Sequence, residues 1–479
     1  MVLRAIRMNL IPSKTHDNAP RINSVMAEVR KRISARILAP GSKLPSVRAF
    51  AKTMLVSTST VVEAYERLMA EGTIHSRPGS GFYVAAALAP LSLAEIGPKL
   101  DHAVDPFWVS RLALDGQSGM IKPGCGWMPP SWMPEEAIRR AMRSVARADT
   151  DLLTDYGTPL GLLPLRKLLS RRLSENGVHA APEHIMLMDS GTHAIDLLCR
   201  FLLEPGQTVL VDDPCYFNFH ALLRAHRVKI IGVPYTPSGP DVALFEEALN
   251  EHKPRLYITN SAIHNPTGAV LSPVTAHRVL MLAERAGLTI IEDDIFADFE
   301  NQKAPRLAAF DGLSRVVQIG SFSKTLSASI RCGYIAVPQP WIEPLTDMKI
   351  ATSFSGNQLC EAVVLAALKD GSYRRHIETV KVRLSRARVE TTSRLRALGI
   401  TPWIEPQAGI FLWCILPEGV DAAKVARHAL LKHVVLAPGN IFSQSYAALT
   451  HMRFNVSQCD DPKMMEVLSE AIDTARSIL

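Results

Sequence analysis

Hydrophobic positions along this chain follow one spacing before residue 85 and another beyond residue 121. Between residues 22 and 71, apolar side chains recur every three or four positions, as they do on one face of a helix. Beyond residue 121, short apolar runs alternate with longer amphipathic segments. The runs expected to be strands are 208–212, 229–233, 256–260, 288–293, 316–321 and 334–337. Such alternation predicts an α/β domain with a mostly parallel, doubly wound sheet.

The N-terminal pattern predicts three helices followed by a hairpin. The first helix is expected from Ile22 to Ile37, and Ser46 and Ser57 are natural N-caps of a short second helix and a third helix. Two short strands with a glycine-rich turn between them follow within residues 74–84. This order of elements is typical of a winged helix-turn-helix, whose third helix enters the major groove of DNA.

Charge is distributed very unevenly along the chain. Residues 1–84 hold 13 Lys and Arg against five Asp and Glu, a balance of +8, whereas the remainder holds 40 against 41, a balance of −1. A basic module joined to a neutral domain indicates a nucleic-acid partner. Charge alone fits a solvated basic surface equally well, and a three-helix module that binds protein is the alternative to the winged helix.

The candidate contacts to double-stranded promoter DNA lie on the second helix, at the start of the third helix and on the wing. They are Arg48, Lys52, Ser57, Thr58, Ser59, Thr60, Arg77 and Gly79. This region resembles the GntR family of bacterial regulators, in the motifs Leu44-Pro45-Ser46-Val47-Arg48, Thr60-Val61-Val62 and Gly79-Ser80-Gly81-Phe82-Tyr83-Val84. The resemblance implies promoter binding. It departs from the family at Thr58, where the family often carries arginine.

Composition and cysteine spacing indicate a globular protein of a reducing compartment. The 479 residues are 47% hydrophobic, yet no stretch approaches the ~18 unbroken apolar residues of a membrane span. The opening residues, 1–7, lack the apolar block of a secretory signal. The seven cysteines contain no Cys-x-x-Cys pair, which argues against a disulfide framework and a structural zinc site. We therefore expect a cytoplasmic protein of several domains with no metal and no membrane partner.

The expected organisation has four parts. They are an N-terminal arm over 1–21, the winged helix-turn-helix over 22–84, a linker over 85–120 and a large domain over 121–479. The linker contains several prolines and one short helix expected near Trp108–Leu114. Because the linker is long, the DNA module can rest on its own large domain or on that of a partner subunit.

Chemically useful residues follow the predicted strands, and α/β sheets bind ligands at the carboxyl ends of their strands. Asp293 ends one strand, Asn265 lies in the turn after another, and Lys324 follows a third. Gly191 precedes a helix whose free N-terminal amides suit a phosphate. One carboxylate, one amide, one amine and one phosphate cradle together predict a site for pyridoxal 5′-phosphate (PLP).

Each candidate residue has an expected role in this site. Lys324 is expected to bond to the aldehyde, Asp293 to keep the pyridine nitrogen protonated, and Asn265 to donate to the 3′ oxygen. Tyr216 is expected to stack on the ring. The residues expected around the phosphate are Thr192, His193, Ser321, Ser323 and Arg331. Each of these residues alone also fits a cap, a turn, a core position or a solvated surface, so their order and strand-end placement are what favour a cofactor site.

Residues 121–479 resemble fold-type I aminotransferases of the aspartate aminotransferase superfamily. The motifs are Tyr156-Gly157, Ser190-Gly191-Thr192-His193, Asn265-Pro266-Thr267-Gly268, Glu292-Asp293-Asp294, Ser321-Phe322-Ser323-Lys324, Arg331 and Pro438-Gly439. The resemblance implies a PLP-dependent transferase fold, a homodimer, a large subdomain over about 151–350 and a small subdomain from 121–150 and 351–479. It also implies that Arg453 holds an amino-acid α-carboxylate and that Tyr156 reaches the phosphate of the neighbouring subunit.

The functional hypothesis depends on one departure from the aminotransferase pattern and on the fusion of the N-terminal module to the large domain. Ile295 and Phe296 stand where these enzymes usually have a tyrosine bonded to the 3′ oxygen, which weakens the expectation of transamination but not of cofactor binding. A GntR-type module joined to such a domain resembles the MocR-type regulators. The leading hypothesis is therefore a PLP-dependent transcriptional regulator that senses PLP, a small amino compound, or both. A working aminotransferase and a DNA-binding protein with an inactive structural domain are the alternatives.

Overall fold

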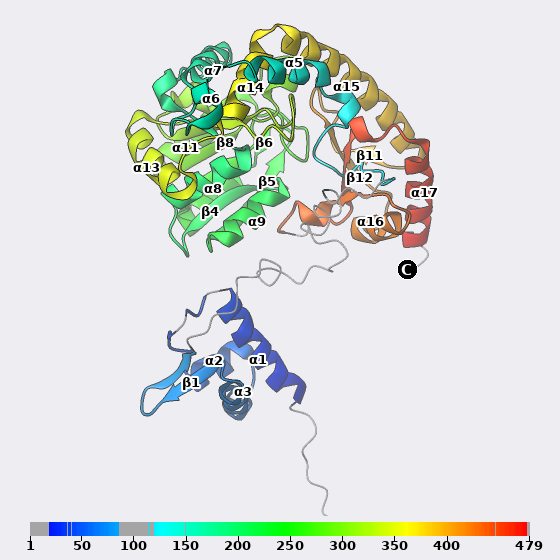
Figure 1. Cartoon of the computed structure of the whole chain (residues 1–479). Helices are drawn as coiled ribbons and strands as arrows, with labels where there is room; N and C mark the ends of the chain where they lie inside the picture. The colour runs from blue at the N-terminus through cyan, green and yellow to red at the C-terminus, as the bar shows by residue number, and fades with distance from the viewer. Residues whose placement is uncertain are drawn as a thin grey trace, which may run out of the picture. The chain divides into compact units, whose positions relative to one another are not determined.

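The computed structural model describes residues 19–85, 114 and 119–476, apart from positions 36, 40, 149 and 446. The chain divides into two compact units, residues 1–99 and 100–479 (Figure 1). Most of the expected N-terminal arm and most of the expected linker lie outside the described residues, as does nearly all of the short helix expected near Trp108–Leu114.

The N-terminal unit has the predicted order of elements. The elements are α1 (Ala19–Ser34), α2 (Val47–Met54), α3 (Thr58–Ala70), β1 (Ile74–Arg77) and β2 (Gly81–Val84). The two strands form an antiparallel hairpin in which Ile74 pairs with Val84. Ser46 accepts a hydrogen bond from the Ala49 amide and Ser57 accepts one from the Thr60 amide, so both act as N-caps as predicted. Helix α1 was expected to reach Ile37 but ends at Ser34.

One tyrosine joins the parts of this unit. Tyr65 on α3 is fully buried, and its ring centroid lies 4.9 Å from that of Phe82 on the wing and 6.1 Å from that of Phe50 on α2. Its hydroxyl donates to the Pro45 carbonyl at 3.1 Å. Because one side chain packs against α2 and the wing together, the position of the hairpin beside α3 is fixed by the core.

The second unit is built on an eight-stranded sheet whose order is β3-β10-β9-β8-β7-β4-β5-β6. Its strands are β3 (Ile185–Met188), β4 (Thr208–Asp213), β5 (Lys229–Thr236), β6 (Gly239–Pro240), β7 (Leu256–Thr259), β8 (Thr289–Asp293), β9 (Val316–Ser321) and β10 (Gly333–Ala336). Strands β5, β4, β7, β8 and β9 run parallel, whereas β10 is antiparallel to both of its neighbours. The prediction of a mostly parallel α/β sheet is confirmed.

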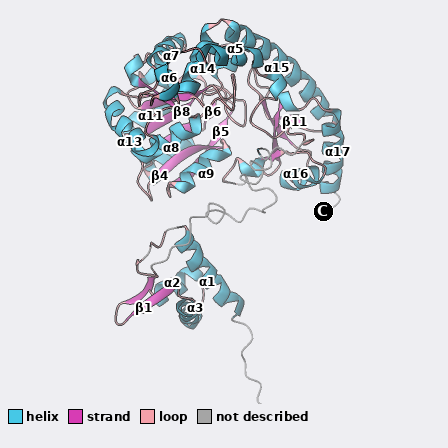
Figure 2. Cartoon of the chain, in the orientation of Figure 1, coloured by secondary structure: helices cyan, strands magenta, loops and turns pink. Residues whose placement is uncertain are grey.

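Helices cover both faces of this sheet (Figure 2). Leu210 on β4 packs in one core cluster and its neighbours Val209 and Val211 pack in another, so both faces of the strand are buried. The first face carries α5 (Glu135–Val145), α7 (Leu163–Glu175), α10 (Val242–His252), α11 (Pro273–Ala286), α12 (Leu307–Asp311) and α14 (Gln358–Lys369). The second face carries α8 (Gly191–Leu202), α9 (Phe217–Ala225) and α13 (Ile342–Ser353).

A smaller antiparallel sheet completes the second unit, in the order β11-β12-β14-β13. Its strands are β11 (Thr401–Pro402), β12 (Phe411–Ile415), β13 (Ala437–Pro438) and β14 (His451–Asn455). Helices α15 (Ser372–Ala397), α16 (Ala422–Leu431) and α17 (Pro462–Arg476) pack against it around a core of its own. The short helix α6 (Thr150–Thr154) lies on the other side of the unit (Figure 1). Among the described residues, no helix combines the length and apolar character that crossing a membrane requires.

Candidate functional site

The carboxyl ends of five strands in the large sheet carry most of the predicted site residues. Asp293 is the last residue of β8, and Ser321 is the last residue of β9. Tyr216 follows β4, two residues after the cis bond between Asp213 and Pro214. Asn265 follows β7 and is joined to Pro266 by a cis bond. Thr192 and His193 lie in the first turn of α8, after β3. The strand-end rule therefore places these side chains along one edge of the sheet.

Lys324 and Asp293 are electrostatic neighbours within this edge. The pKa of Lys324 is lowered to about 8, mainly by burial and also by the nearby Arg453 charge, while Asp293 opposes the shift. Burial raises the pKa of Asp293 to about 7. One Asp293 oxygen accepts from the Ile295 amide at 3.2 Å, and the Asp293 carbonyl accepts from Asn260 at 3.0 Å. A cation beside this carboxylate would keep it ionised.

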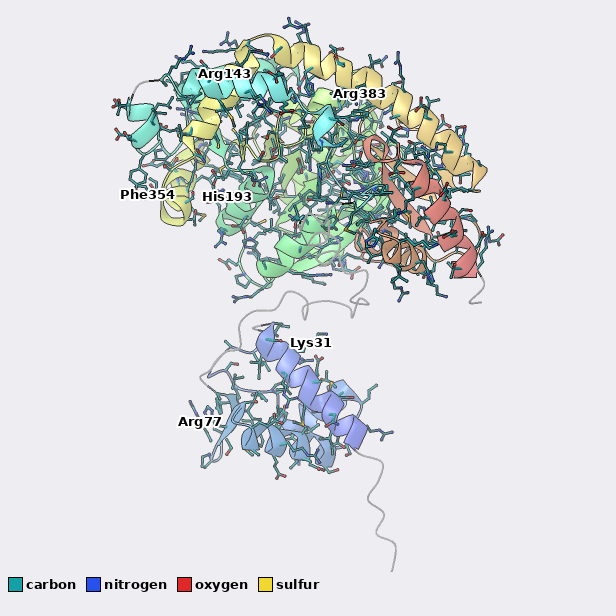
Figure 3. The ribbon with its side chains drawn as sticks, turned by 45° about the vertical axis from the view of Figure 1, so that its right-hand side comes forward. Lys31, Arg77, Arg143, His193, Phe354 and Arg383 are labelled. Carbon is teal, nitrogen blue, oxygen red and sulfur yellow. The ribbon has the colours of Figure 1, made fainter. Side chains whose placement is uncertain are left out.

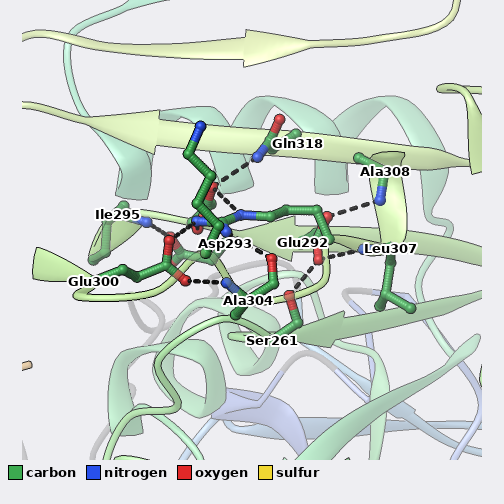
Figure 4. A network of polar contacts seen from close by, with 12 residues as sticks. Ser261, Glu292, Asp293, Ile295, Glu300, Ala304, Leu307, Ala308 and Gln318 are labelled. Atoms are coloured by element: carbon green, nitrogen blue, oxygen red, sulfur yellow. Dashed lines mark hydrogen bonds and ion pairs between the residues drawn. The ribbon is translucent and has the colours of Figure 1, made fainter. Parts of the chain in front are cut away.

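A buried polar network fixes the end of β8 that carries Asp293 (Figure 4). Arg306, 1% exposed, donates to Asp294 through Nε at 3.2 Å and to Glu300 through Nη2 at 2.6 Å. Gln318 also donates to Asp294, at 2.8 Å. Burial raises the pKa values of both Asp294 and Glu300, and Arg306 opposes the shift in each. The guanidinium thus compensates two carboxylates that are shielded from water.

Glu292 anchors the other side of the same network. It accepts hydrogen bonds from the amides of Leu307 at 2.7 Å and Ala308 at 2.9 Å, in the first turn of α12, and from the Ser261 hydroxyl. Burial raises the pKa of Glu292 to about 7. Strand β8 is therefore tied to α12 directly before the cofactor-binding candidate Asp293.

Arg453 on β14 lies fully buried beside the strand edge. Its Nη1 donates to Asn265 Oδ1 at 2.9 Å and its Nη2 to the Gly124 carbonyl at 2.7 Å, while its Nε has no hydrogen-bond partner among the residues that the structure describes. The guanidinium carbon lies 4.1 Å from the ring centroid of Phe411 and 4.7 Å from that of Phe442. Arg453 forms no ion pair with a carboxylate in the described part of the chain, so its charge is free to meet an anionic ligand.

A glycine keeps space open between the lysine and the arginine. A Cβ atom at Gly126 would lie 3.8 Å from Lys324 Nζ and 3.9 Å from Arg453 Nη2. The amine and the guanidinium therefore both lie beside the same point, where a Cβ at residue 126 would be in van der Waals contact with each of them. An amine, a guanidinium that no described carboxylate neutralises and the buried carboxylate of the nearby Asp293 fit PLP with a carboxylate-bearing amino compound.

The proposed phosphate cradle lies at the start of α8. Ser190 Oγ accepts from the His193 amide at 3.0 Å, and His193 Nδ1 lies 3.2 Å from Asp189 Oδ2. A Cβ at Gly191 would lie 3.9 Å from Ser321 Cβ, and Ser321 Oγ donates to Ser323 Oγ at 3.1 Å. The helix N-terminus and the two serines thus lie together, whereas Thr192 and Arg331 are exposed side chains. His193 is labelled in Figure 3.

A buried His–Asp pair beside the site was missed by sequence reasoning. His264 Nε2 lies 3.3 Å from Asp212 Oδ2, and its ring stacks on Tyr235 with centroids 3.7 Å apart. Asp212 also accepts from Thr259 at 2.7 Å and from the Tyr257 hydroxyl. His264 directly precedes Asn265, so this pair ties the Asn265 turn to β4. Asp212 ends one predicted strand and His264 follows another, and this strand-end position is the sequence signal that could have identified the pair.

Phe296 and Tyr156 are two further positions that were compared with the aminotransferase pattern. Phe296 is buried, and its ring centroid lies 5.6 Å from that of Phe411, so this position offers packing and no hydroxyl. Tyr156 is 78% exposed, and its ring lies 4.8 Å from that of Phe354, which is 59% exposed. Tyr156 makes no described contact with the predicted site residues of its own chain. Phe354 appears at the outer edge of the unit in Figure 3.

Tyr216 is held by aromatic neighbours and a buried sulfur contact. Its ring centroid lies 5.0 Å from that of Phe217 and 5.5 Å from that of Phe219. Burial raises the pKa of its hydroxyl. The preceding Cys215 Sγ lies 3.1 Å from His220 Nε2, which fixes the loop that carries the tyrosine.

No cluster of three or more His, Cys, Asp or Glu suited to a metal ion occurs within the described ranges.

The candidate DNA contacts of the N-terminal unit differ in exposure. Arg48, Lys52, Thr58, Ser59 and Gly79 are exposed, and so is Arg77, whose guanidinium lies 4.4 Å from the ring centroid of Tyr83 on the wing (Figure 3). Thr60 is instead 3% exposed. Its hydroxyl lies 2.7 Å from Ser57 Oγ, so Thr60 supports the N-cap and does not face solvent.

Family comparisons match both units. The family described as "Aminotransferase class I and II" matches residues 129–472, and "Bacterial regulatory proteins, gntR family" matches residues 21–84. The HTH-type transcriptional regulator YdfD of Bacillus subtilis, described as uncharacterized, is 27% identical over 95% of this chain and 96% of its own length. The HTH-type transcriptional regulator NorG of Staphylococcus aureus is 28% identical over 84% of this chain and 92% of its own length.

Solved structures match the second unit. A kynurenine aminotransferase of Pyrococcus horikoshii, solved in complex with PMP, has a TM-score of 0.70 and 26% identity over 77% of this chain and 94% of its own. An archaeal alanine:glyoxylate aminotransferase has a TM-score of 0.72 and 25% identity over 80% of this chain and 97% of its own. The fold of the second unit is therefore that of aminotransferases.

Proposed function

Because this chain belongs to the class I and II aminotransferase family and carries an N-terminal GntR-type domain, we propose that it is a transcriptional regulator that binds promoter DNA and senses PLP, a small amino compound, or both. Its curated relatives named above are transcriptional regulators with matches over most of both chains. In this proposal the winged helix over 22–84 binds double-stranded DNA, and residues 121–479 form the sensor. The domain order is that of MocR-type regulators.

One observation carries the sensor proposal: Lys324 Nζ and Arg453 Nη2 face the space above Gly126. When bound, PLP supplies an aldehyde that condenses with primary amines and a ring that accepts electrons. Lys324 would be its amine partner, and Asp293 would hold a proton on the ring nitrogen. Arg453 would bind the carboxylate of an amino-acid effector through its guanidinium fork.

The remaining polar groups would hold the cofactor in place. Asn265 would donate to the ring oxygen, and Tyr216 would cover the ring face. The phosphate would lie at the N-terminus of α8, where amides and the helix dipole favour an anion. The residues proposed around it are Thr192, His193, Ser321, Ser323 and Arg331. The placement of Thr192 and His193 at the start of α8, and of Ser321 and Ser323 at and just after the end of β9, supports this arrangement.

We propose further that the protein is a cytoplasmic homodimer. Tyr156 and Phe354 form an exposed aromatic pair, and aromatic side chains are enriched at protein–protein interfaces. Phe354 has a positive φ of 64°, which is uncommon for a bulky residue and is typical of functional positions. In the dimer, Tyr156 would reach the phosphate of the neighbouring subunit.

Regulation would act through linkage between the two ligands. An effector that binds one arrangement of the dimer more tightly shifts the population toward that arrangement, and the affinity for DNA changes by the same coupling factor. A catalytically active aminotransferase is the second candidate function, because Lys324, Asp293 and Arg453 are all present. Phe296, with no hydroxyl to offer, weighs against rapid turnover.

The test is a footprint of the full-length protein on the DNA next to its own gene, repeated with PLP and with a panel of amino acids. A regulator is expected to protect a discrete site whose affinity depends on PLP or on one amino compound, and Lys324→Ala should abolish that dependence. Multiple-turnover production of keto acids with no ligand effect on DNA binding would instead establish the enzyme. A footprint unaffected by any ligand and by Lys324→Ala would leave only a structural role for the large unit.

A further inference from the structure

Helix α3 lacks the side chains that usually identify purines in DNA. Among its 13 residues, Arg67 is the only Lys, Arg, Asn or Gln. Its Nη2 donates to Glu63 Oε1 at 2.6 Å, so it is already paired within the helix. These four residue types make the bidentate contacts that distinguish guanine and adenine in the major groove. The first turns of a recognition helix contact the base edges, and here they offer no such contact.

The exposed side chains of these turns offer methyl groups instead. Val62 is 38% exposed, although the neighbouring Val61 is completely buried. Thr58 is also exposed, and it lies four residues before Val62 on the same side of the helix. The hydroxyl of Ser59 lies 2.8 Å from Ser57 Oγ, which itself caps the helix. Val62 and the methyl group of Thr58 therefore give the start of α3 an exposed apolar patch, beside the Glu63 carboxylate that is paired with Arg67.

We infer that Thr58 and Val62 select thymine through its C5-methyl group. Thymine is the one standard DNA base that projects a methyl group into the major groove. Placing that methyl against the methyl groups of Val62 and Thr58 removes apolar surface from water, which is favourable. A purine on the same strand presents no methyl group in the major groove, so it cannot make this apolar contact. The inference rests on the proposed DNA binding and names the base that the helix reads.

The shape of the unit supports this placement. Ser57 caps the first turn of α3, and Tyr65 in the following turns is locked between α2 and the wing. The exposed side of α3 is therefore presented rigidly. The exposed basic residues Arg48, Lys52 and Arg77 lie on the flanking elements α2 and β1. Phosphate contacts from both sides would hold the helix in the groove, while the bases are left to Thr58 and Val62.

The experiment selects binding sites from random-sequence duplexes with the full-length protein and PLP, then replaces each selected thymine by uracil. Uracil differs only by the missing methyl group. Wild type is expected to bind the uracil duplex about fourfold more weakly at one position of each half-site, the loss that one buried methyl group produces. The double variant Thr58→Ser, Val62→Ala, which removes the proposed contacting methyl groups and keeps the hydroxyl, is expected to bind both duplexes equally. Ile37→Ala, which removes an exposed apolar side chain outside α3, should keep the wild-type discrimination.

A methyl-rescue arm tests the same contact without relying on a variant. Replacing the thymine by cytosine should weaken binding, and 5-methylcytosine should recover about fourfold relative to cytosine, because it restores the methyl group. Sequence-selective binding that is indifferent to both methyl substitutions would overturn the inference and leave the proposed function intact. Selection of no DNA sequence at all would overturn the proposed function, and the inference with it.

Discussion

Arg453 Nη1 donates a hydrogen bond of 2.9 Å to Asn265 Oδ1, although the two residues are 188 positions apart. Asn265 belongs to the turn after β7 of the large sheet, and Arg453 lies on β14 of the small sheet. One bond therefore connects the two sheets at the point where the cofactor and the effector are proposed to meet. A ligand that engages either side chain acts on both sheets.

The reactivity of Lys324 should depend on pH in a way that an ordinary lysine does not. Its pKa is lowered to about 8, and only the neutral amine is nucleophilic. The rate of PLP capture is expected to rise with pH and to level off above pH 8. At pH 7 about a tenth of the amine is neutral, roughly 200-fold more than for an unperturbed lysine. Stopped-flow absorbance from about pH 6 to about pH 10 measures this rate. Nα-acetyl-lysine is the control, and a rate that keeps rising to pH 10 would contradict the prediction.

Arg453→Lys should weaken binding of amino acids selectively. The substitution keeps a positive charge but removes the fork that binds a carboxylate through two parallel hydrogen bonds. The affinity of the PLP-loaded protein for amino acids is expected to fall about tenfold to hundredfold. Calorimetric titration with an amino acid and with the matching amine that lacks the carboxylate checks this. The amine should be unaffected, and Arg388→Lys, whose arginine bonds the Gln407 and Gly409 carbonyls, is the control. Equal losses for both ligands would place the carboxylate elsewhere.

Arg306→Met should destabilise the large unit strongly at neutral pH. It leaves Asp294 and Glu300 buried without a cation, and breaking such a buried pair costs about 3–5 kcal/mol. The loss should shrink as the pH falls. The pKa values of both carboxyls are already raised in the folded protein. The folded variant therefore takes up protons more readily than the unfolded chain, and acid favours it.

Urea denaturation at two pH values measures the effect on Arg306→Met. Arg315→Met is the control, because Arg315 is partly exposed and lies 3.9 Å from Asp311. Such a surface pair contributes about 0–1 kcal/mol. A loss that is independent of pH would show that packing, and not uncompensated charge, dominates.

Arg77→Ala should weaken DNA binding in a manner that depends on salt and not on sequence. Arg77 lies on the wing with its guanidinium over Tyr83, and a phosphate contact there adds one released counterion. The slope of log affinity against log salt is expected to fall by about 1. Fluorescence anisotropy at several salt concentrations measures it, with the exposed Arg386→Ala in the large unit as control. An unchanged slope with altered sequence preference would assign Arg77 to base reading.

The large sheet was predictable because its strands are buried on both faces. Runs such as 256–260 and 316–321 match β7 (Leu256–Thr259) and β9 (Val316–Ser321) closely, since continuous apolar residues mark strands covered by helices on both sides. Strand β3 was missed because Ile185–Met188 is rich in Met and Leu, which favour helices as readily as strands. The direction of β10 could not be predicted, because an apolar run carries no information on polarity.

The site residues could be predicted from the sequence, but the contacts between their side chains could not. The strand-end rule singled out Asp293, Asn265 and Lys324, and the structure places them at one edge. The bond from Asn265 to Arg453 and the pairing of His264 with Asp212 depend on long-range packing. Likewise, the burial of Thr60 followed from the rotation of α3 about its axis. Position in the sequence therefore predicted which residues belong to the site, whereas tertiary contacts determine which of their polar atoms remain available to a ligand.

The absence of a side chain at residue 126 bears on how binding of a ligand is communicated between the two sheets. Because a Cβ at residue 126 would lie 3.8 Å from the Lys324 amine and 3.9 Å from the Arg453 guanidinium, a small molecule bound beside Gly126 would contact one group that follows the large sheet and one that belongs to the small sheet. A methyl group at residue 126 would be in van der Waals contact with both side chains and would compete with that molecule for the same place.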